Sequence, residues 1–86
     1  MPYRIDFLVA ARRHLRALPV DVQAWIQRSI DALGDEPRPS GTAAMVGEGG
    51  LLRIRVGNYR VMYDIDDGER LVTVVRIGHR KDVYRR

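Results

Sequence analysis

Three arginines crowd one short segment of the chain, LLRIRVGNYRVMY at positions 51–63. They are Arg53, Arg55 and Arg60. A guanidinium group presents its N–H donors in a planar fork that matches the oxygens of a phosphate, so arginines gathered on one surface favour phosphate binding. Arginine also keeps its proton inside proteins, which makes it a poor general base. The segment therefore indicates phosphate binding and charge stabilisation, although any one of these arginines taken alone could simply be solvated.

The end of the chain, GHRKDVYRR at positions 78–86, supplies further candidate groups. Arg80 follows the last apolar segment closely enough to reach the same surface. Tyr84 is suited either to stacking on a nucleotide base or to packing the C-terminus against the fold. A histidine side chain can both accept and donate a proton in general acid–base catalysis, so His79 is a candidate for proton transfer as well as for a structural role. The other histidine, His14, lies among helix arginines and is expected on the surface.

The composition limits the other kinds of chemistry that the chain can perform. It has no cysteine, which excludes disulfides and thiol catalysis, and only two histidines, which argues against a histidine-rich metal centre. We therefore expect neither a metal nor a cofactor. The net charge is +4, the isoelectric point is near 10.1, and every Lys or Arg residue except Lys81 is an arginine. Such an excess suits a polyanionic partner, but a GC-rich genome would produce it as well.

Length and hydropathy indicate one small soluble domain that spans residues 1–86. Of the 86 residues, 45% are hydrophobic, which is enough for a core without disulfides or metals. The stretch MPYRIDFLVAARRHL lacks the apolar centre of a signal peptide, and no apolar run approaches the length of a membrane span. The sequence thus predicts a cytoplasmic protein that does not enter a membrane.

Apolar periodicity predicts the order of the elements. It favours a strand over 2–7, helices over 8–18 and 21–33, and strands over 52–56, 59–65 and 71–77. Pro19 and Gly34 end the two helices, and Asp21 caps or supports the start of the second. The stretch 34–50, with five glycines and two prolines, is expected to be a loop. The result is an α+β fold, βαα followed by a three-stranded antiparallel meander, with two helices packed on one sheet face.

Alternation along the strands predicts where the arginines point. Side chains of a strand alternate between its faces, so Arg53 and Arg55 emerge together, about 6.8 Å apart. The apolar set of the next strand leaves Arg60 on that same face, with Asp64 as the one acid nearby. We expect the helices to cover the opposite face and this one to stay open to a ligand. A polyanion would relieve the repulsion among these cations.

The hairpin RIRVGNYRVMY, the turn IDDGE and the ending RIGHRKDVYRR have an order and spacing that resemble RelE-type toxins of bacterial toxin–antitoxin systems. The opening YRIDFLVAARRHLRALP resembles the first strand and helix of the same family, so the likeness extends over nearly the whole chain. It implies a microbial-ribonuclease-like fold and a ribosome-dependent endonuclease that cuts messenger RNA in the ribosomal A site. In that family a ribose 2′-hydroxyl attacks the adjacent phosphate, which requires cations, a base and an acid.

The resemblance implies a role for each candidate residue. Arg53 and Arg55 match paired basic residues on the first hairpin strand, and Arg60 matches a phosphate-binding arginine. Arg80 matches a basic residue that acts as the acid or stabilises charge. Tyr84 matches the tyrosine that stacks on or orients the nucleotide.

Two departures from the family pattern affect these roles. Relatives often have lysine at the position of Arg53 or Arg55, where a lysine with a lowered pKa could act as the base. An arginine there is better suited to stabilising charge, with His79 or the ribosomal RNA assisting proton transfer. The stretch before the hairpin is often lysine-rich in relatives but reads GTAAMVGEGG here, which would weaken ribosome docking or move it onto the helix arginines.

The resemblance also implies partners and leaves alternatives open. The expected partners are the ribosome with its messenger RNA, and an acidic, partly disordered antitoxin that holds the toxin in a hetero-oligomer. Operator DNA would be contacted only through the antitoxin. One alternative is a ParE-like toxin that inhibits DNA gyrase, although such relatives generally lack the full set of basic residues and tyrosine. The other is a degenerate, non-toxic member that serves as an antitoxin-binding module.

Overall fold

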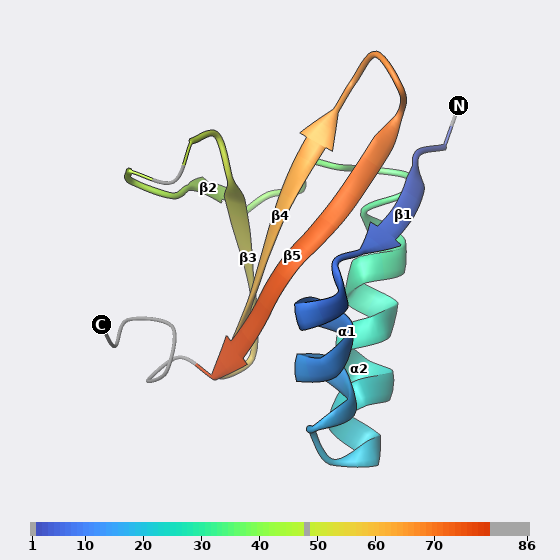
Figure 1. Ribbon diagram of the computed structural model, residues 1–86, viewed down its shortest axis with the longest axis vertical. Helices are drawn as coiled ribbons and strands as arrows, with labels where there is room; N and C mark the ends of the chain where they lie inside the picture. Colours follow the sequence, from blue (N-terminus) through green and yellow to red (C-terminus); the bar gives the residue numbers. More distant parts are fainter. Residues whose placement is uncertain (1, 48, 80–86) are drawn as a thin grey trace.

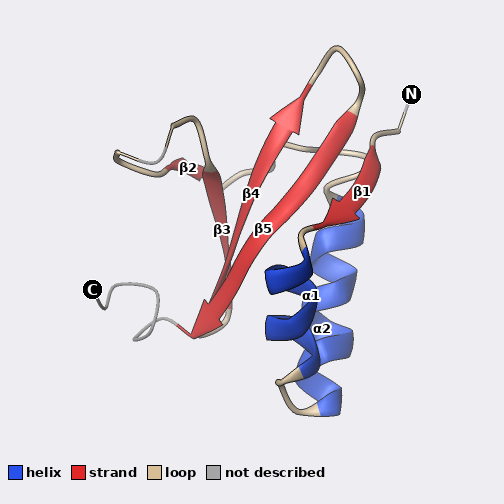
Figure 2. Ribbon diagram, in the orientation of Figure 1, coloured by secondary structure: helices blue, strands red, loops and turns tan. Residues whose placement is uncertain are grey.

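The computed structural model describes residues 2–47 and 49–79 of the chain. Its elements are β1 (Arg4–Phe7), α1 (Val9–Arg16), α2 (Val20–Ala32), β2 (Ala43–Ala44), β3 (Leu52–Val56), β4 (Tyr59–Asp66) and β5 (Leu71–His79). The predicted α+β class is confirmed, with both helices on one side of a twisted sheet (Figure 1, Figure 2). Neither helix in the described ranges is long and apolar enough to span a membrane.

The sheet has the strand order β1-β5-β4-β3-β2. The meander of β3, β4 and β5 is antiparallel, as predicted, and β1 joins the far side of β5 in parallel, since the helices carry the chain across the sheet. The expectation of a plain loop over 34–50 was wrong in one respect. Ala43 and Ala44 form β2, which pairs antiparallel with Arg53 and Leu52 at the start of β3.

Apolar side chains of the helices and of the inner sheet face form one core. Ala11 and Leu15 of α1 and Ile26 and Ile30 of α2 are buried against it. The strands contribute Ile54, Val56, Val61, Tyr63, Val72, Val74 and Ile77. Fully burying one large apolar side chain stabilises a fold by about 1.5–3 kcal/mol, so this layer holds the helices to the sheet.

The ends of the helices differ from the predicted positions. α1 ends at Arg16, and α2 begins at Val20 with Pro19 as its N-cap residue, so Asp21 lies in the first turn and makes no capping hydrogen bond. Gly34 follows α2 as predicted, but it does not serve as a left-handed helix cap. A Cβ there would lie 3.1 Å from the carbonyl oxygen of Tyr3, whose N–H donates to the Gly34 carbonyl at 2.7 Å. The glycine lets the start of the chain approach the end of α2.

Asp67, in the turn between β4 and β5, connects three distant parts of the chain. Its carboxylate accepts a hydrogen bond from the Tyr3 hydroxyl at 2.6 Å and pairs with both terminal nitrogens of Arg38 at 3.0 and 3.2 Å. The Arg38 guanidinium, followed by the Tyr3 hydroxyl, lowers the pKa of Asp67 below its ordinary value. The same hydrogen bond raises the pKa of Tyr3.

The turn of the β3–β4 hairpin rests on the side chain of the only tryptophan. Gly57 has φ +60°, a left-handed conformation that the two-residue turn requires, and a Cβ there would lie 2.2 Å from Cη2 of Trp25. Gly57 is therefore fixed both by its backbone angle and by its approach to the α2 indole.

Replacing Gly57 by alanine should lower the free energy of unfolding by about 1–3 kcal/mol, because the methyl group displaces the Trp25 ring and strains the turn. Gly41→Ala is the matched control. Gly41 has φ +93° with nothing within 4 Å of a Cβ, so it carries the backbone cost alone, about 1 kcal/mol. Urea unfolding gives both values, and the emission of Trp25 should shift to longer wavelength only in Gly57→Ala. Equal losses with unchanged emission would contradict the packing role of Gly57.

The contacts of Asp67 predict a pH-dependent stability. Because its pKa is lower in the folded chain, its stabilisation is complete above the unfolded value of about 3.9 and is lost as the pH falls through the folded value. Wild type should therefore be more stable than Asp67→Asn at neutral pH and lose that advantage in acid. Tyr3→Phe tests the alkaline side: because the pKa of Tyr3 is raised in the folded chain, its contribution is complete below the unfolded value of about 10 and is lost as the pH rises through the folded value. An advantage over Asp67→Asn that persists in strong acid would refute the linkage.

Candidate functional site

The sheet face opposite the helices carries the predicted arginines in adjacent positions. Arg55 of β3 pairs directly with Arg60 of β4, and Gly78 of β5 follows beyond Arg60. The neighbouring row contains Arg53, Met62 and a further arginine of β5. The prediction that Arg53, Arg55 and Arg60 share one face is thus met by the register. Since like charges directly opposite each other destabilise a sheet, this grouping has an energetic cost.

Arg76 is an additional arginine of this face that the sequence pattern did not predict. It lies opposite Met62, and a register shift between Met62 and Tyr63 makes Tyr63 pair with Val74 rather than with Val75. Strict alternation would place Arg76 on the core side with Val74, but the extra residue of this β-bulge turns it to the arginine side. The two consecutive valines at 74 and 75, after which the apolar period changes phase, are the signal that could have revealed the bulge.

The arginine face, which carries Arg53, Arg55, Arg60 and Arg76, is less open to solvent than expected. Arg60 is 7% exposed and Met62 is 0% exposed, whereas Arg53 is half-buried and Arg55 is exposed. The Nε–H of Arg55 donates to the Gly57 carbonyl at 3.2 Å, which directs the guanidinium along the hairpin toward its turn. Arg55 is therefore the arginine of this hairpin that a ligand meets first.

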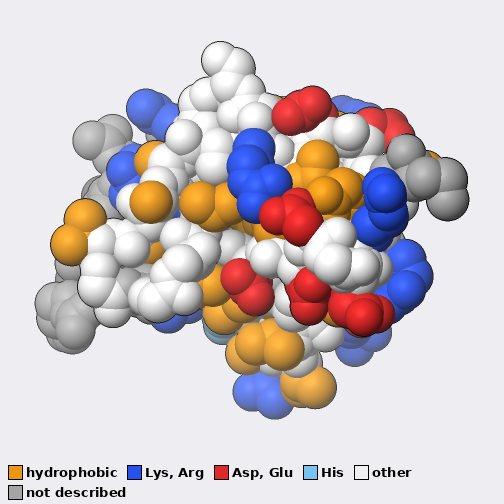
Figure 3. All heavy atoms as spheres, turned by 90° about the horizontal axis from the view of Figure 1, so that it is seen from above, with side chains coloured by type: hydrophobic (Ala, Val, Ile, Leu, Met, Phe, Trp, Pro, Cys, Tyr) orange, Lys and Arg blue, Asp and Glu red, His pale blue; other side chains and the backbone are white. Residues whose placement is uncertain are grey.

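Acidic residues lie at the other end of the same strands. Asp64 and Asp66 follow Arg60 on the same face of β4, and Asp67 and Glu69 continue into the turn. Figure 3 looks onto that end of the molecule and shows several acidic side chains there, with Lys or Arg side chains among them. The hairpin end of the face thus carries arginines away from these acids, so a polyanion would be attracted most strongly to the region around Arg55 and Arg60.

Neither histidine lies on the arginine face. His79 pairs with Tyr59, a residue of the core side, and the two rings meet edge to face with centroids 5.3 Å apart. The register therefore does not bring His79 onto the arginine face. His14 was expected on the surface but is half-buried, and its Nδ1 accepts a hydrogen bond from the Ile77 N–H at 3.3 Å. This hydrogen bond satisfies the backbone N–H of Ile77 on the edge of β5, beyond the point where β1 ends.

Two predicted site residues, Arg80 and Tyr84, lie outside the described residues. Within the part that the structure describes, no group of three or more His, Asp or Glu side chains is arranged to hold a metal ion. The part of the candidate site that the structure describes consists of Arg53, Arg55, Arg60 and Arg76. Arginine side chains are positively charged at physiological pH.

Comparison with known proteins identifies relatives along the whole chain. The family model described as the ParE toxin of the type II toxin–antitoxin system parDE matches residues 5–84. Toxin RelG of Mycobacterium tuberculosis is 37% identical over 87 residues, covering 100% of both chains. Toxin RelE of the same organism is 33% identical over 85 residues, covering 98% of this chain and 88% of the relative.

Solved structures of similar fold include chains from toxin–antitoxin complexes and an isolated toxin. A chain of the RelBE2 complex of Mycobacterium tuberculosis has a TM-score of 0.84 and 33% identity, with 93% of both chains covered. A chain of the archaeal RelE–RelB complex of Pyrococcus horikoshii has a TM-score of 0.80 and 26% identity, covering 93% of this chain and 97% of that one. The isolated RelE toxin of E. coli, with a TM-score of 0.77, 23% identity and coverage of 90% and 83%, shares the fold.

The direct opposition of Arg55 and Arg60 predicts that Arg55→Thr will stabilise the fold. Removing one of two like charges should raise the free energy of unfolding by about 0.2–1 kcal/mol at low ionic strength, and salt should reduce the gain. Arg4→Thr is the control, since Arg4 is also an exposed strand arginine but pairs with Leu71. Urea unfolding at two salt concentrations measures both. If the two variants change stability equally at both concentrations, repulsion across the hairpin is not the cause.

Proposed function

Since the chain belongs to the RelE/ParE family of type II toxins, we propose that it is a ribosome-dependent endonuclease that cleaves messenger RNA. The observation that carries this proposal is the grouping of Arg53, Arg55, Arg60 and Arg76 on one sheet face, with Arg55 directly opposite Arg60. A fold that merely needed solubility would gain nothing from like charges across a hairpin. A scissile phosphate with its two flanking phosphates would neutralise them.

In the proposed reaction, the 2′-hydroxyl of a ribose attacks the adjacent phosphorus while the bond from phosphorus to the 5′ oxygen breaks. Negative charge accumulates on the phosphorane oxygens, and Arg55 and Arg60 stabilise it. Arg60 is suited to this role because burial fixes its guanidinium and weakens the screening by water. Arg53 and Arg76 bind the neighbouring phosphates. Arg80 stabilises the charge that develops on the leaving 5′ oxygen, which takes its proton from water because an arginine keeps its own. Tyr84 stacks on or orients a nucleotide.

The group that removes the proton of the 2′-hydroxyl is not one of the arginines, which stay protonated. His79 would have to act from the end of β5, because its register position belongs to the core side with Tyr59. The proposal therefore assigns the arginines to binding and charge stabilisation, and leaves proton acceptance to His79 or to the RNA environment of the ribosome. If the ribosome supplies or positions the group that accepts this proton, cleavage by the toxin will require the ribosome.

The second candidate function is inhibition of DNA gyrase, and the match to a ParE toxin family model favours it. The two functions predict different consequences of expression. Messenger RNA cleavage gives discrete ends on primer extension, whereas gyrase inhibition gives DNA damage with intact transcripts. The curated relatives named RelG and RelE, together with the arginine face, favour RNA cleavage.

We also propose an antitoxin partner for this chain, as in the complexes of its structural relatives. An acidic chain would be attracted to the same face that attracts RNA. The resulting hetero-oligomer would contact operator DNA through the antitoxin, and the toxin would act in the cytoplasm when released.

Arg60→Ala and Arg80→Ala should each abolish growth arrest on induction and slow cleavage of ribosome-bound messenger RNA by about 10²–10³-fold, the usual cost of losing one transition-state contact. Arg4→Ala, on the opposite edge of the sheet, should leave cleavage unchanged and serves as the matched control.

Thermal unfolding and antitoxin co-purification must show that the variants are folded, and Arg60→Lys covers the case in which alanine destabilises this buried position. Full toxicity of well-folded Arg60→Ala and Arg80→Ala would refute the assignment. Absence of growth arrest in wild type would instead indicate a non-toxic, antitoxin-binding member.

A further inference from the structure

Helix α1 carries three arginines outside the arginine face. Arg12, Arg13 and Arg16 lie three, four and seven positions after Val9, so all four residues share one face of the helix, and each is exposed. The helix contains no acidic residue, and within the ranges that the structure describes none of the three arginines forms a salt bridge. The helix dipole favours Arg13 and Arg16 in the last turn, but Arg12 precedes that turn. Helix stability does not explain the grouping, since like charges at these spacings destabilise a helix.

The three arginines line a cleft of about 190 Å³ at the end of β1. Phe7, the last residue of β1, and Val9 supply its apolar surface. The guanidinium carbon of Arg12 lies over the Phe7 ring, 4.7 Å from its centroid, in a cation–π contact. This contact holds one face of the planar guanidinium against the ring. The other face points away from Phe7 and is accessible, because Arg12 is exposed.

A stacked guanidinium beside two further cations suits the two parts of a nucleotide. Bases stack on the planes of arginine side chains, and guanidinium forks bind the oxygens of a phosphate in pairs. Arg12 offers the plane, while Arg13 and Arg16 lie in the same cleft and offer the forks. The volume is below the range of about 300–1,000 Å³ that is usual for ligand pockets, so the cleft suits part of one nucleotide rather than a larger ligand.

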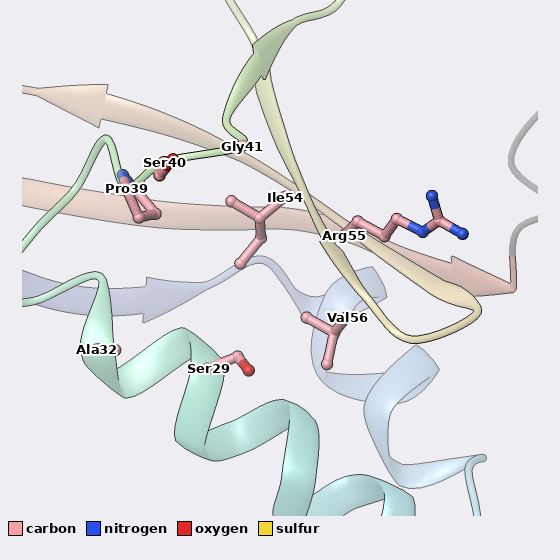
Figure 4. Close-up of a pocket in the computed structure, with 8 residues that line it drawn as sticks. All are labelled: Ser29, Ala32, Pro39, Ser40, Gly41, Ile54, Arg55 and Val56. Carbon is pink, nitrogen blue, oxygen red and sulfur yellow. The ribbon is translucent and has the colours of Figure 1, made fainter.

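The cleft is separate from the arginine face. Figure 4 shows Arg55 pointing away from Ile54 and Val56, whose side chains point across a mainly apolar cavity toward α2, so the arginine face looks away from the helices. Phe7 instead packs on the helix side, and β1 is the edge strand beyond β5 (Figure 1). Three strand spacings, about 14 Å in all, lie between β1 and β3. A phosphate bound in the cleft is therefore out of reach of Arg55.

We propose that the cleft between α1 and β1 binds a nucleotide, with the base stacked on Arg12 and the phosphate held by Arg13 and Arg16. The nucleotide comes free from solution or as one unit of a single-stranded RNA, since both present the same base and phosphate. An acidic polypeptide would match the charge of the cleft but would leave the stacking face of Arg12 without a partner. The inference does not rest on the proposed nuclease, because it uses no residue of the arginine face.

The test follows the backbone amide and arginine side-chain signals of the isotope-labelled full chain by nuclear magnetic resonance. The probes are inorganic phosphate, adenosine 5′-monophosphate, and a tetra-adenylate with 2′-O-methyl riboses, which lacks the attacking hydroxyl of the proposed cleavage. Each probe should give saturable shifts in the signals of α1. Adenosine 5′-monophosphate should bind about fivefold or more tightly than phosphate, because the base adds its stacking. Tighter binding of the tetra-adenylate than of the mononucleotide would assign the cleft to an RNA strand, and equal or weaker binding would assign it to a free nucleotide.

Arg16→Gln and Arg28→Gln are matched variants, since both remove one exposed charge from a helix but only Arg16 lines the cleft. At physiological salt, Arg16→Gln should weaken binding of adenosine 5′-monophosphate about three- to fivefold, and Arg28→Gln by less than about 1.5-fold. Thermal unfolding checks that each variant is folded.

Arg12→Lys separates stacking from charge, because it keeps the positive charge and removes the planar group. It should weaken binding of adenosine 5′-monophosphate about threefold or more and change that of inorganic phosphate by less than about 1.5-fold. Equal effects on both probes would refute base stacking and with it the nucleotide site.

The proposal also fails if no probe binds saturably at about 10 mM, if the shifts are confined to the β3–β4 hairpin, or if Arg16→Gln and Arg28→Gln act equally. Binding of acetyl-tetraglutamate as tight as that of the tetra-adenylate would assign the cleft to an acidic chain instead. Because the methylated tetra-adenylate cannot be cut by the proposed reaction, these outcomes are independent of whether the chain cleaves messenger RNA.

Discussion

The register of the β3–β4 hairpin determines which residues reach each face of the sheet, and the rest of the molecule depends on it. A slip of one residue would place Arg53, Arg55 and Arg60 in the core and the apolar residues of both strands in solvent. The two-residue turn fixes this register through the left-handed backbone of Gly57, and Trp25 of α2 holds the turn from the helix side. The helices therefore contribute to the arginine face although they lie on the other side of the sheet.

The same register brings Arg55 opposite Arg60, and the fold must tolerate this repulsion. Charge is distributed along the strands in a way that limits the cost, since Asp64 and Asp66 lie on the same face of β4 as Arg60. The acids are nevertheless displaced toward the β4–β5 turn, where Asp67 pairs with Arg38. The hairpin end of the arginine face thus keeps an excess of positive charge. The charge difference between the two ends of this face would orient an approaching polyanion along the strands.

Much of this arrangement could be predicted from the sequence, because local patterns determine it. The apolar alternation on either side of Gly57 and Asn58 predicts both strands, the turn and the common face of three arginines. The remaining features depend on contacts between distant segments. The pairing of Ala43 and Ala44 needs the edge of β3, and the bulge that turns Arg76 outward arises from the match between β4 and β5.

The two histidines show the same limit of prediction from sequence, because their positions in the structure differ from those expected. Sequence position suggested that His79 is near the arginines and that His14 is on the surface. The register instead pairs His79 with Tyr59, and α1 brings His14 to the backbone of Ile77, a residue 63 positions away. A residue's distance along the chain from a strand end says nothing of which face it occupies when a bulge intervenes. The face of each side chain can be assigned only once both partners of the ladder are known.

Arg55 and Arg60 place an exposed and a buried cation at one point of the sheet. Arg55 is exposed and its Nε–H donates to the Gly57 carbonyl, whereas Arg60, directly opposite, is 7% exposed. Water screens a charge at the surface more than a buried one, so the buried guanidinium acts more strongly on a charge beside it. In the proposed reaction, the exposed arginine therefore meets the phosphate first and the buried one stabilises the charge that develops on it. The repulsion between the two arginines is the cost of this arrangement, and a bound phosphate removes it.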